Sequence, residues 1–159
     1  MFYRVQQFIK AMTAQITKED LSFVKQFLNQ AEVDLFLRLK PYEQRHCIDV
    51  ASKLKEMISG DAEMIKLGLL HDIGKIKYPL HPIEKSIIVI LDRLTDGHIR
   101  KYNQYKMVKC YYEHPQIGYE MLKEVGNYDE AFLKLIKNHH NQEEKIPKLV
   151  LLQEADNLS

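Results

Sequence analysis

Apolar residues recur along most of the chain at spacings of three and four, which is the period of an α-helix, and strand-like alternation does not persist between turn signals. This pattern predicts an all-α fold. With 159 residues the chain can bury one hydrophobic core, so we expect a single domain over residues 1–159. Its core is expected at about residues 31–158, preceded by an N-terminal helical extension over residues 1–30.

Helix start and stop signals divide the first part of this pattern. Thr17 and Asp20 have the spacing of a capping box and open the first helix. A second amphipathic helix follows at about residues 31–39. Pro41 suits the first turn of a longer helix that ends near Gly60.

The later helices follow from similar signals. Asp61 can cap a helix that runs to His71 and Asp72, with Gly74 as its terminator. Proline, glycine and asparagine residues separate the remaining helices, which are expected at about residues 83–94, 100–112, 115–125, 129–140 and 147–158.

Composition and charge narrow the classes of function. The 23 basic and 22 acidic residues nearly cancel, so no overall field favours a dedicated binder of nucleic acid or of a membrane surface. Cys47 and Cys110 lack CxxC spacing, which indicates neither a disulfide framework nor a thiolate zinc site and fits a reducing cytoplasm. Because no apolar run approaches the roughly 18 to 20 residues of a spanning helix, we expect a cytoplasmic protein without a membrane partner.

Seven histidine and aspartate residues form a candidate metal site. Several of them continue apolar stripes: His46 lies one turn before Val50, and Asp156 follows Leu149 and Leu152 at helical spacing. An inward imidazole or carboxylate without a partner is costly, whereas converging groups can satisfy one another through a metal ion. Any one histidine alone is compatible with an ordinary hydrogen-bonded core residue, but the whole set favours a metal site. The set is His46, His71, Asp72, His114, His139, His140 and Asp156.

The order of these residues resembles the HD superfamily of metal-dependent phosphohydrolases. The segments His71-Asp-Ile-Gly-Lys75 and His114-Pro-Gln-Ile-Gly118 carry the resemblance, which covers about residues 31–158. It implies an HD-domain helical bundle in which Asp72 bridges two metal ions. By the same resemblance, one ion is held by His46, His71, Asp72 and Asp156, and the other by Asp72, His114, His139 and His140.

The residue types of the candidate ligands also indicate metal ions as the cofactor. Mixed imidazole and carboxylate ligands suit two divalent transition-metal ions, with Fe or Mn as the first expectation and Zn, Ni or Co as further candidates. Two ions held about 3.5 to 4 Å apart lower the pKa of a shared water and offset charge on phosphate oxygens. Asp72 and Lys75 are the expected catalytic residues, because the Lys75 ammonium can reach a phosphate bound at the metals. An ordinary solvated lysine is the alternative at that position.

The segment His114-Pro-Gln-Ile-Gly118 and the His139-His140 doublet most resemble the HD-GYP branch of the superfamily, which cleaves cyclic dinucleotides. The residues after His140 contain no Gly-Tyr-Pro segment, and Tyr42 lies where some of these enzymes place a carboxylate for a third metal, although Glu43 is adjacent. These departures argue against cyclic-di-GMP hydrolysis and against a trinuclear site. His81 and His98 fall outside the pattern and are expected on the surface.

Three functions therefore compete. The first is hydrolysis of a phosphomonoester or phosphodiester, with a small phosphorylated molecule, expected to be a nucleotide, as substrate. The second is a non-catalytic signalling module of the same fold that binds a nucleotide or a protein. The third is a di-iron oxygenase. The tyrosines and lysines of residues 101–112 scatter around their helix, so a nucleic-acid partner is not favoured. The sequence does not define the oligomeric state.

Overall fold

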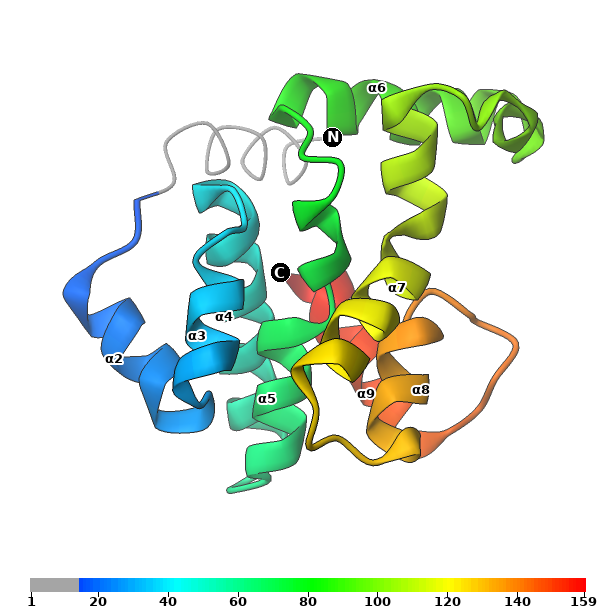
Figure 1. The fold of residues 1–159 in the computed structure, drawn as a ribbon. Coiled ribbons are helices and arrows are strands. Elements are labelled where there is room, and N and C mark those ends of the chain that lie inside the picture. Colours follow the sequence, from blue (N-terminus) through cyan, green and yellow to red (C-terminus); the bar gives the residue numbers. More distant parts are fainter. Residues whose placement is uncertain (1–14) are drawn as a thin grey trace.

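The chain forms a bundle of helices, described here from a computed structural model for residues 15–159 (Figure 1). These residues contain eight α-helices, two short 3-10 helices and no strand, which confirms the all-α prediction. The α-helices are α2 (Lys18–Phe27), α3 (Gln30–Phe36), α4 (Pro41–Met57), α5 (Ala62–Leu70), α6 (Pro82–Leu94), α7 (Lys106–Val125), α8 (Glu130–Lys137) and α9 (Pro147–Leu158). The 3-10 helices are η1 (Ile73–Ile76) and η2 (His98–Tyr102). The first fourteen residues of the expected N-terminal extension lie outside the described residues.

The helix start signals predicted from the sequence are present at the starts of the helices. The Thr17 hydroxyl accepts a hydrogen bond from the Asp20 amide, and the Asp20 carboxylate accepts one from the Thr17 amide, so the capping box is complete. Pro41 occupies the first turn of α4. The Asp61 carboxylate accepts a hydrogen bond from the amide of Met64 and caps α5.

The predicted role of Gly74 as a helix terminator was wrong. Helix α5 ends at Leu70, and Gly74 lies inside η1, packed against the middle of α7. A Cβ atom at Gly74 would overlap the carbonyl oxygen of His114 and lie 2.6 Å from the amide nitrogen of Gly118. This glycine is therefore required because two backbones approach closely, not because a helix must stop there.

The predicted break near residues 112–115 was also wrong. Helix α7 runs from Lys106 to Val125 with Pro115 inside it, and only η2 forms over the first residues of the expected helix at 100–112. Proline usually ends a helix because it has no amide hydrogen for the preceding turn. Here His114, Pro115 and Gly118 are buried against η1 and α8, and this packing outweighs the lost hydrogen bond.

The predicted helix at 129–140 is shorter than expected. Helix α8 ends at Lys137, so His139 and His140 lie in the turn that follows it. The Nδ1 atom of His139 lies 2.7 Å from the carbonyl oxygen of Ile136. The end of the helix thus turns this imidazole back toward the bundle.

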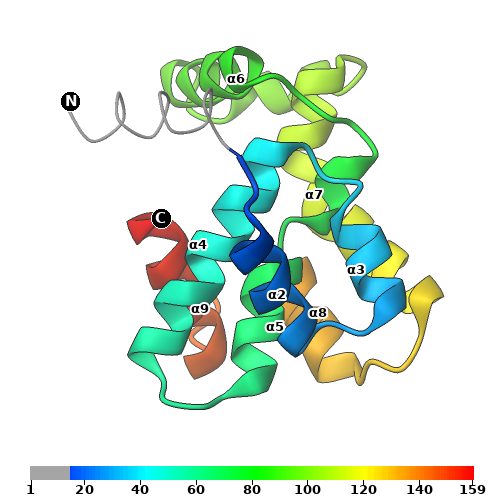
Figure 2. The same cartoon turned by 90° about the vertical axis from the view of Figure 1, so that its left-hand side faces the viewer.

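The core lies around α5, which packs against α2, α4, α8 and α9. Figure 2 shows α4, α5 and α9 side by side, with α2 in front of them. Val24 and Leu28, which fall in the expected extension, are buried in the same hydrophobic cluster as α4 and α5. Helix α6 extends away from the bundle in Figure 1 and buries only Ile88. Among the described helices, none is long and apolar enough to cross a bilayer.

Candidate metal centre

All seven predicted ligand residues come together at one place in the bundle. His46 projects from α4, His71 and Asp72 from the end of α5, His114 from α7, His139 and His140 from the turn after α8, and Asp156 from α9. The core packing of α5 against its neighbours brings these helix segments together. Asp72 lies between two groups of imidazoles, and its two carboxylate oxygens face different groups.

The first group surrounds Oδ2 of Asp72. The Nε2 atoms of His46 and His71 lie 3.6 Å and 3.5 Å from this oxygen. One ligand atom from each of the three residues lies within 4.8 Å of the others, which is a spacing that one metal ion can bridge. Asp156 is adjacent, with Oδ1 at 2.9 Å from Nε2 of His46 and 3.9 Å from Nε2 of His71.

The second group surrounds Oδ1 of Asp72. The Nε2 atoms of His114 and His139 lie 3.2 Å and 3.7 Å from this oxygen. Nε2 of His140 lies 3.2 Å from Nε2 of His114, and one ligand atom from each of the four residues again lies within 4.8 Å of the others. The two groups share Asp72, as the expected bridging carboxylate would.

Backbone carbonyls fix which nitrogen of each buried ring faces the centre. The Nδ1 atoms of His71 and His114 lie 2.8 Å and 2.6 Å from the carbonyl oxygens of Gly68 and Cys110, and Nδ1 of His139 contacts a carbonyl in the same way. A carbonyl oxygen can only accept, so each Nδ1 carries the ring proton and each Nε2 presents a lone pair.

These lone pairs have no proton to share with one another. Nε2 of His114 and Nε2 of His139 lie 3.3 Å apart, and both are acceptors when the rings are neutral. Nε2 of His71 and Oδ1 of Asp72 are buried without any hydrogen bond. Buried acceptors that face each other are costly unless a cation lies between them. By their donor chemistry, the residues of the two groups could therefore hold metal ions.

The charge states of the ligands also suit metal binding. Burial lowers the pKa of His71 to about 4, and burial also lowers the pKa of His114, so both rings are neutral near pH 7. Burial alone would raise the pKa of Asp72, but the Lys75 ammonium and the His71 ring hold it well below its usual range. Neutral imidazole and ionised carboxylate are the forms that bind metals.

Lys75 lies directly beside the shared carboxylate. Its ammonium contacts Oδ2 of Asp72 and lies 3.2 Å from Oε2 of Glu43. Burial would lower the pKa of Lys75, but the carboxylates of Asp72 and Glu43 raise it well above its usual value. Lys75 therefore keeps its positive charge beside the centre.

The centre opens into a pocket of about 610 Å³. Polar groups of the candidate site form part of its lining, including Asp72, Lys75 and His114. Apolar residues from α6 and the loop before it form another part, among them Leu80 and Ile88. A volume of this size can hold a small organic molecule, with polar groups on one side to orient it.

Two charged residues of this pocket were not among the site residues expected from the sequence. Glu43 is buried, and its carboxylate contacts the ammonium groups of Lys75 and Lys85. Glu43 lies three residues before His46, on nearly the same face of α4, which is a signal that could have been used. Lys85 carries no such signal, because only the packing of α6 brings it to the pocket.

The remaining residues singled out from the sequence lie outside the two groups of ligands. His81 and His98 are exposed, as expected. Tyr42 donates its hydroxyl hydrogen to the carbonyl oxygen of Leu80 at 2.6 Å and so holds the loop before α6. It offers no carboxylate for a third metal.

Comparison with known protein families identifies the family to which the chain belongs. Residues 44–159 match the family model of the HD domain, and this match covers most of the chain. The protein therefore belongs to the HD-domain family, whose members are mostly metal-dependent phosphohydrolases. Searches of curated proteins and of solved structures gave no significant match.

Proposed function

We propose that this chain is a metal-dependent phosphohydrolase that hydrolyses a phosphate ester of a small molecule, with a nucleotide as the expected class of substrate. The observation that supports this most directly is the arrangement of Asp72, whose two oxygens face two separate groups of imidazole lone pairs. Membership of the HD-domain family supports the same reaction class.

The proposed ligands follow the two groups. His46, His71, Asp72 and Asp156 would hold one ion, and Asp72, His114, His139 and His140 the other. When bound, two such ions supply an activated water and offset negative charge on the phosphate oxygens.

The residues around the ligands have their own parts in the reaction. Lys75, which keeps its proton, would donate hydrogen bonds to the non-bridging phosphate oxygens as charge develops on them. The apolar wall near Leu80 and Ile88 would hold the organic part of the ester and exclude water from it. In the overall reaction, the water oxygen bonds to phosphorus, the ester P–O bond breaks, and the leaving oxygen takes a proton to become a hydroxyl.

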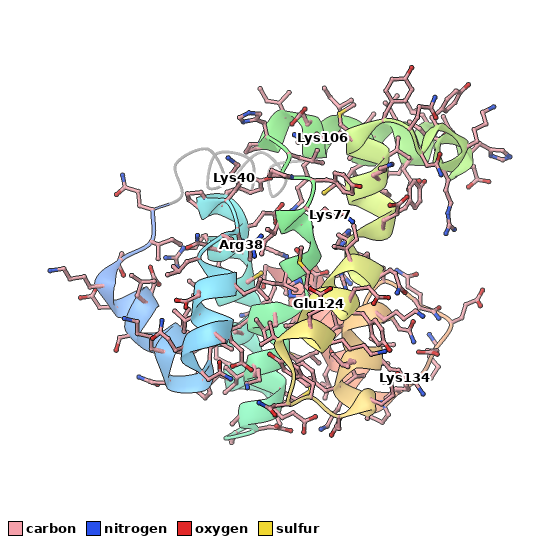
Figure 3. The ribbon with its side chains drawn as sticks, viewed as in Figure 1. Arg38, Lys40, Lys77, Lys106, Glu124 and Lys134 are labelled. Carbon is pink, nitrogen blue, oxygen red and sulfur yellow. The ribbon has the colours of Figure 1, made fainter. Side chains whose placement is uncertain are left out.

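Metal content and turnover test this proposal together. Protein purified without chelator is expected to contain about two equivalents of Fe or Mn, because the two ligand groups share one bridging carboxylate. Asp72→Ala should lose both ions and all turnover of p-nitrophenyl phosphate, bis(p-nitrophenyl) phosphate and nucleoside monophosphates. Glu124→Ala is a matched control, since Glu124 is an exposed carboxylate outside the pocket (Figure 3).

The outcomes separate the competing functions. Hydrolysis that continues without oxygen supports the phosphohydrolase, whereas turnover that requires oxygen would overturn it in favour of a di-iron oxygenase. Bound metal without turnover of any phosphate ester would favour a binding module. If Asp72→Ala disturbs folding, as circular dichroism would show, the isosteric Asp72→Asn provides the same test, because it keeps the shape and removes the charge.

A further inference from the structure

Two ammonium groups from different helices meet at one buried carboxylate beside the candidate metal centre. Oε2 of Glu43 lies 3.2 Å from Nζ of Lys75 in η1 and 3.3 Å from Nζ of Lys85 in α6. The Glu43 side chain is 5% exposed, while that of Lys85 is 38% exposed and borders the pocket. A chain of contacts thus runs from Asp72 through Lys75 and Glu43 to Lys85.

The charges along this chain do not balance once the carboxylate of Asp72 is engaged by cations. Lys75, Lys85 and Glu43 then carry one net positive charge, which Glu43 alone cannot offset. Each ammonium group has three hydrogens to donate, and Lys85 uses only part of them on the two Glu43 oxygens, at 3.3 Å and 3.4 Å. Nζ of Lys85 also lies 5.9 Å from the centre of the Tyr42 ring, and Lys85 lines the pocket, so the surplus charge borders it.

Only one of the two lysines is close to the ligand residues. The Lys75 ammonium contacts Asp72, so it can serve a phosphate bound at the centre. Lys85 contacts none of the candidate metal ligands. The Glu43 carboxylate lies between Lys85 and Lys75, and Lys85 lines the pocket. Glu43 holds the two ammonium groups close enough together for neighbouring anionic groups of one ligand to bind both.

We propose that Lys85, positioned by Glu43, forms a second phosphate subsite, so that the substrate carries a second phosphate group next to the one that is hydrolysed. This inference rests on the proposed phosphohydrolase function and makes it more specific. A diphosphate ester, as in a nucleoside diphosphate, has the required pair of adjacent anions. Water would attack the phosphorus that carries the ester, the ester P–O bond would break, and the alcohol oxygen would take the proton, so that pyrophosphate and the alcohol are the products. A substrate with a single phosphate would leave the Lys85 ammonium without an anionic partner beyond Glu43.

Binding of inorganic pyrophosphate and of inorganic phosphate tests the subsite without any turnover. Both affinities are measured by calorimetry on Mn-loaded protein freed of excess metal, and the ratio of the two is the readout. Lys85→Met keeps much of the apolar stem and removes the charge, so the preference for pyrophosphate should fall by about tenfold. Lys77→Met is the matched control, because Lys77 is exposed in the same region but does not line the pocket (Figure 3).

An unchanged ratio in Lys85→Met would overturn the subsite, as would an equal fall in Lys77→Met. Lys85→Arg retains the charge and should keep the ratio within about threefold of the wild-type value, which guards against a general effect of substitution on folding. The outcome is separate from that of the proposed function. A lower ratio in Lys85→Met without any ester hydrolysis would support the subsite and overturn the phosphohydrolase function. Ester hydrolysis with an unchanged ratio would overturn the subsite alone.

Discussion

Gly74 lies against the backbone of His114, so closely that no side chain fits between η1 and α7. A Cβ atom at Gly74 would overlap the His114 carbonyl oxygen, whereas one at Gly118 would meet its nearest neighbour at 3.3 Å. The same contact fixes the distance between Asp72, two residues before Gly74, and the imidazole of His114. The glycine thus links local packing to the geometry of the candidate metal centre.

Substitution of this glycine should therefore affect both stability and metal binding. Gly74→Ala is expected to lower the free energy of unfolding by about 3 kcal/mol, because α7 must move away from η1. Gly118→Ala should cost only about 1 kcal/mol, since the nearest atoms, the amide nitrogen of Gly74 and a methyl group of Ile136, both lie at 3.3 Å and need to shift by only a few tenths of an ångström. Urea unfolding and metal analysis check this. Equal destabilisation by the two variants would contradict the close backbone contact.

Removal of the Lys75 charge should affect turnover and leave the metals in place. Lys75→Ala is expected to lower kcat on p-nitrophenyl phosphate by about 100-fold, because one donor to the developing negative charge is lost. Metal content should remain that of the wild type, since the ligand set is intact. Lys77→Ala, an exposed lysine outside the pocket, should behave like the wild type. Loss of metal from Lys75→Ala would show that this lysine supports the cluster instead.

The buried histidine His71 makes the stability of the metal-free protein depend on pH. Its pKa is lowered to about 4 in the folded protein from an ordinary value of 6.5, so the unfolded chain binds more protons between these values. The stabilising contribution is complete above pH 6.5 and is lost as the pH falls toward 4. We expect a loss on the order of 2–3 kcal/mol over this range.

Unfolding by urea at a series of pH values, in the presence of chelator, measures this dependence. His71→Asn should reduce the slope of the curve between pH 6.5 and 4, because one of the buried groups that must take up a proton is gone, while His114 remains. His98→Gln serves as a control, since His98 is exposed. An identical slope in wild type and His71→Asn would argue against a neutral, buried His71.

A further buried carboxylate, besides those of Asp72 and Glu43, supports the bundle away from the centre. Glu32 in α3 accepts hydrogen bonds from Nζ of Lys66 at 2.7 Å and from the hydroxyl of Tyr128 at 2.6 Å, and it is 2% exposed. Oε2 of Glu32 also accepts a hydrogen bond from the Asn29 amide at 2.7 Å. Glu32→Ala should lower the free energy of unfolding by about 2 kcal/mol, because all three donors lose their partner.

The exposed ion pair of Glu63 with Lys148 provides the comparison. Glu63→Ala should cost less than about 1 kcal/mol, since exposed pairs are screened by water. Metal content should be unchanged in both variants. A Glu32→Ala variant as stable as Glu63→Ala would show that the buried network contributes little.

Local signals in the sequence predicted the structure correctly where contacts between neighbouring residues decide it. The capping box at Thr17, the cap at Asp61 and the first-turn Pro41 act through hydrogen bonds or dihedral restrictions within one turn, and all three occur as predicted. Helical periodicity likewise predicted the all-α fold. The order of histidines and aspartates indicated the HD-domain family, which the family match confirms.

Packing overrode local signals where segments distant in sequence meet. Pro115 ordinarily ends a helix, but burial of α7 against η1 and α8 retains it inside one. Glycine often ends a helix, but Gly74 is required because its backbone lies against the backbone of α7. Neither outcome can be derived from neighbouring residues, because the decisive contacts join different helices that are separated along the chain.

The sequence by itself determined which candidate donor groups face the bundle, since residue types set the donor chemistry and helical spacing sets the face on which each residue lies. The tertiary structure alone decided how Asp72 divides its two oxygens between imidazole groups, and which ring nitrogens point inward. It also brought Lys85 of α6 to Glu43 of α4, a pairing without any sequence signal. The physical reason is that hydrogen-bonding capacity belongs to each residue, whereas distances between helices arise only from the packing of the whole core.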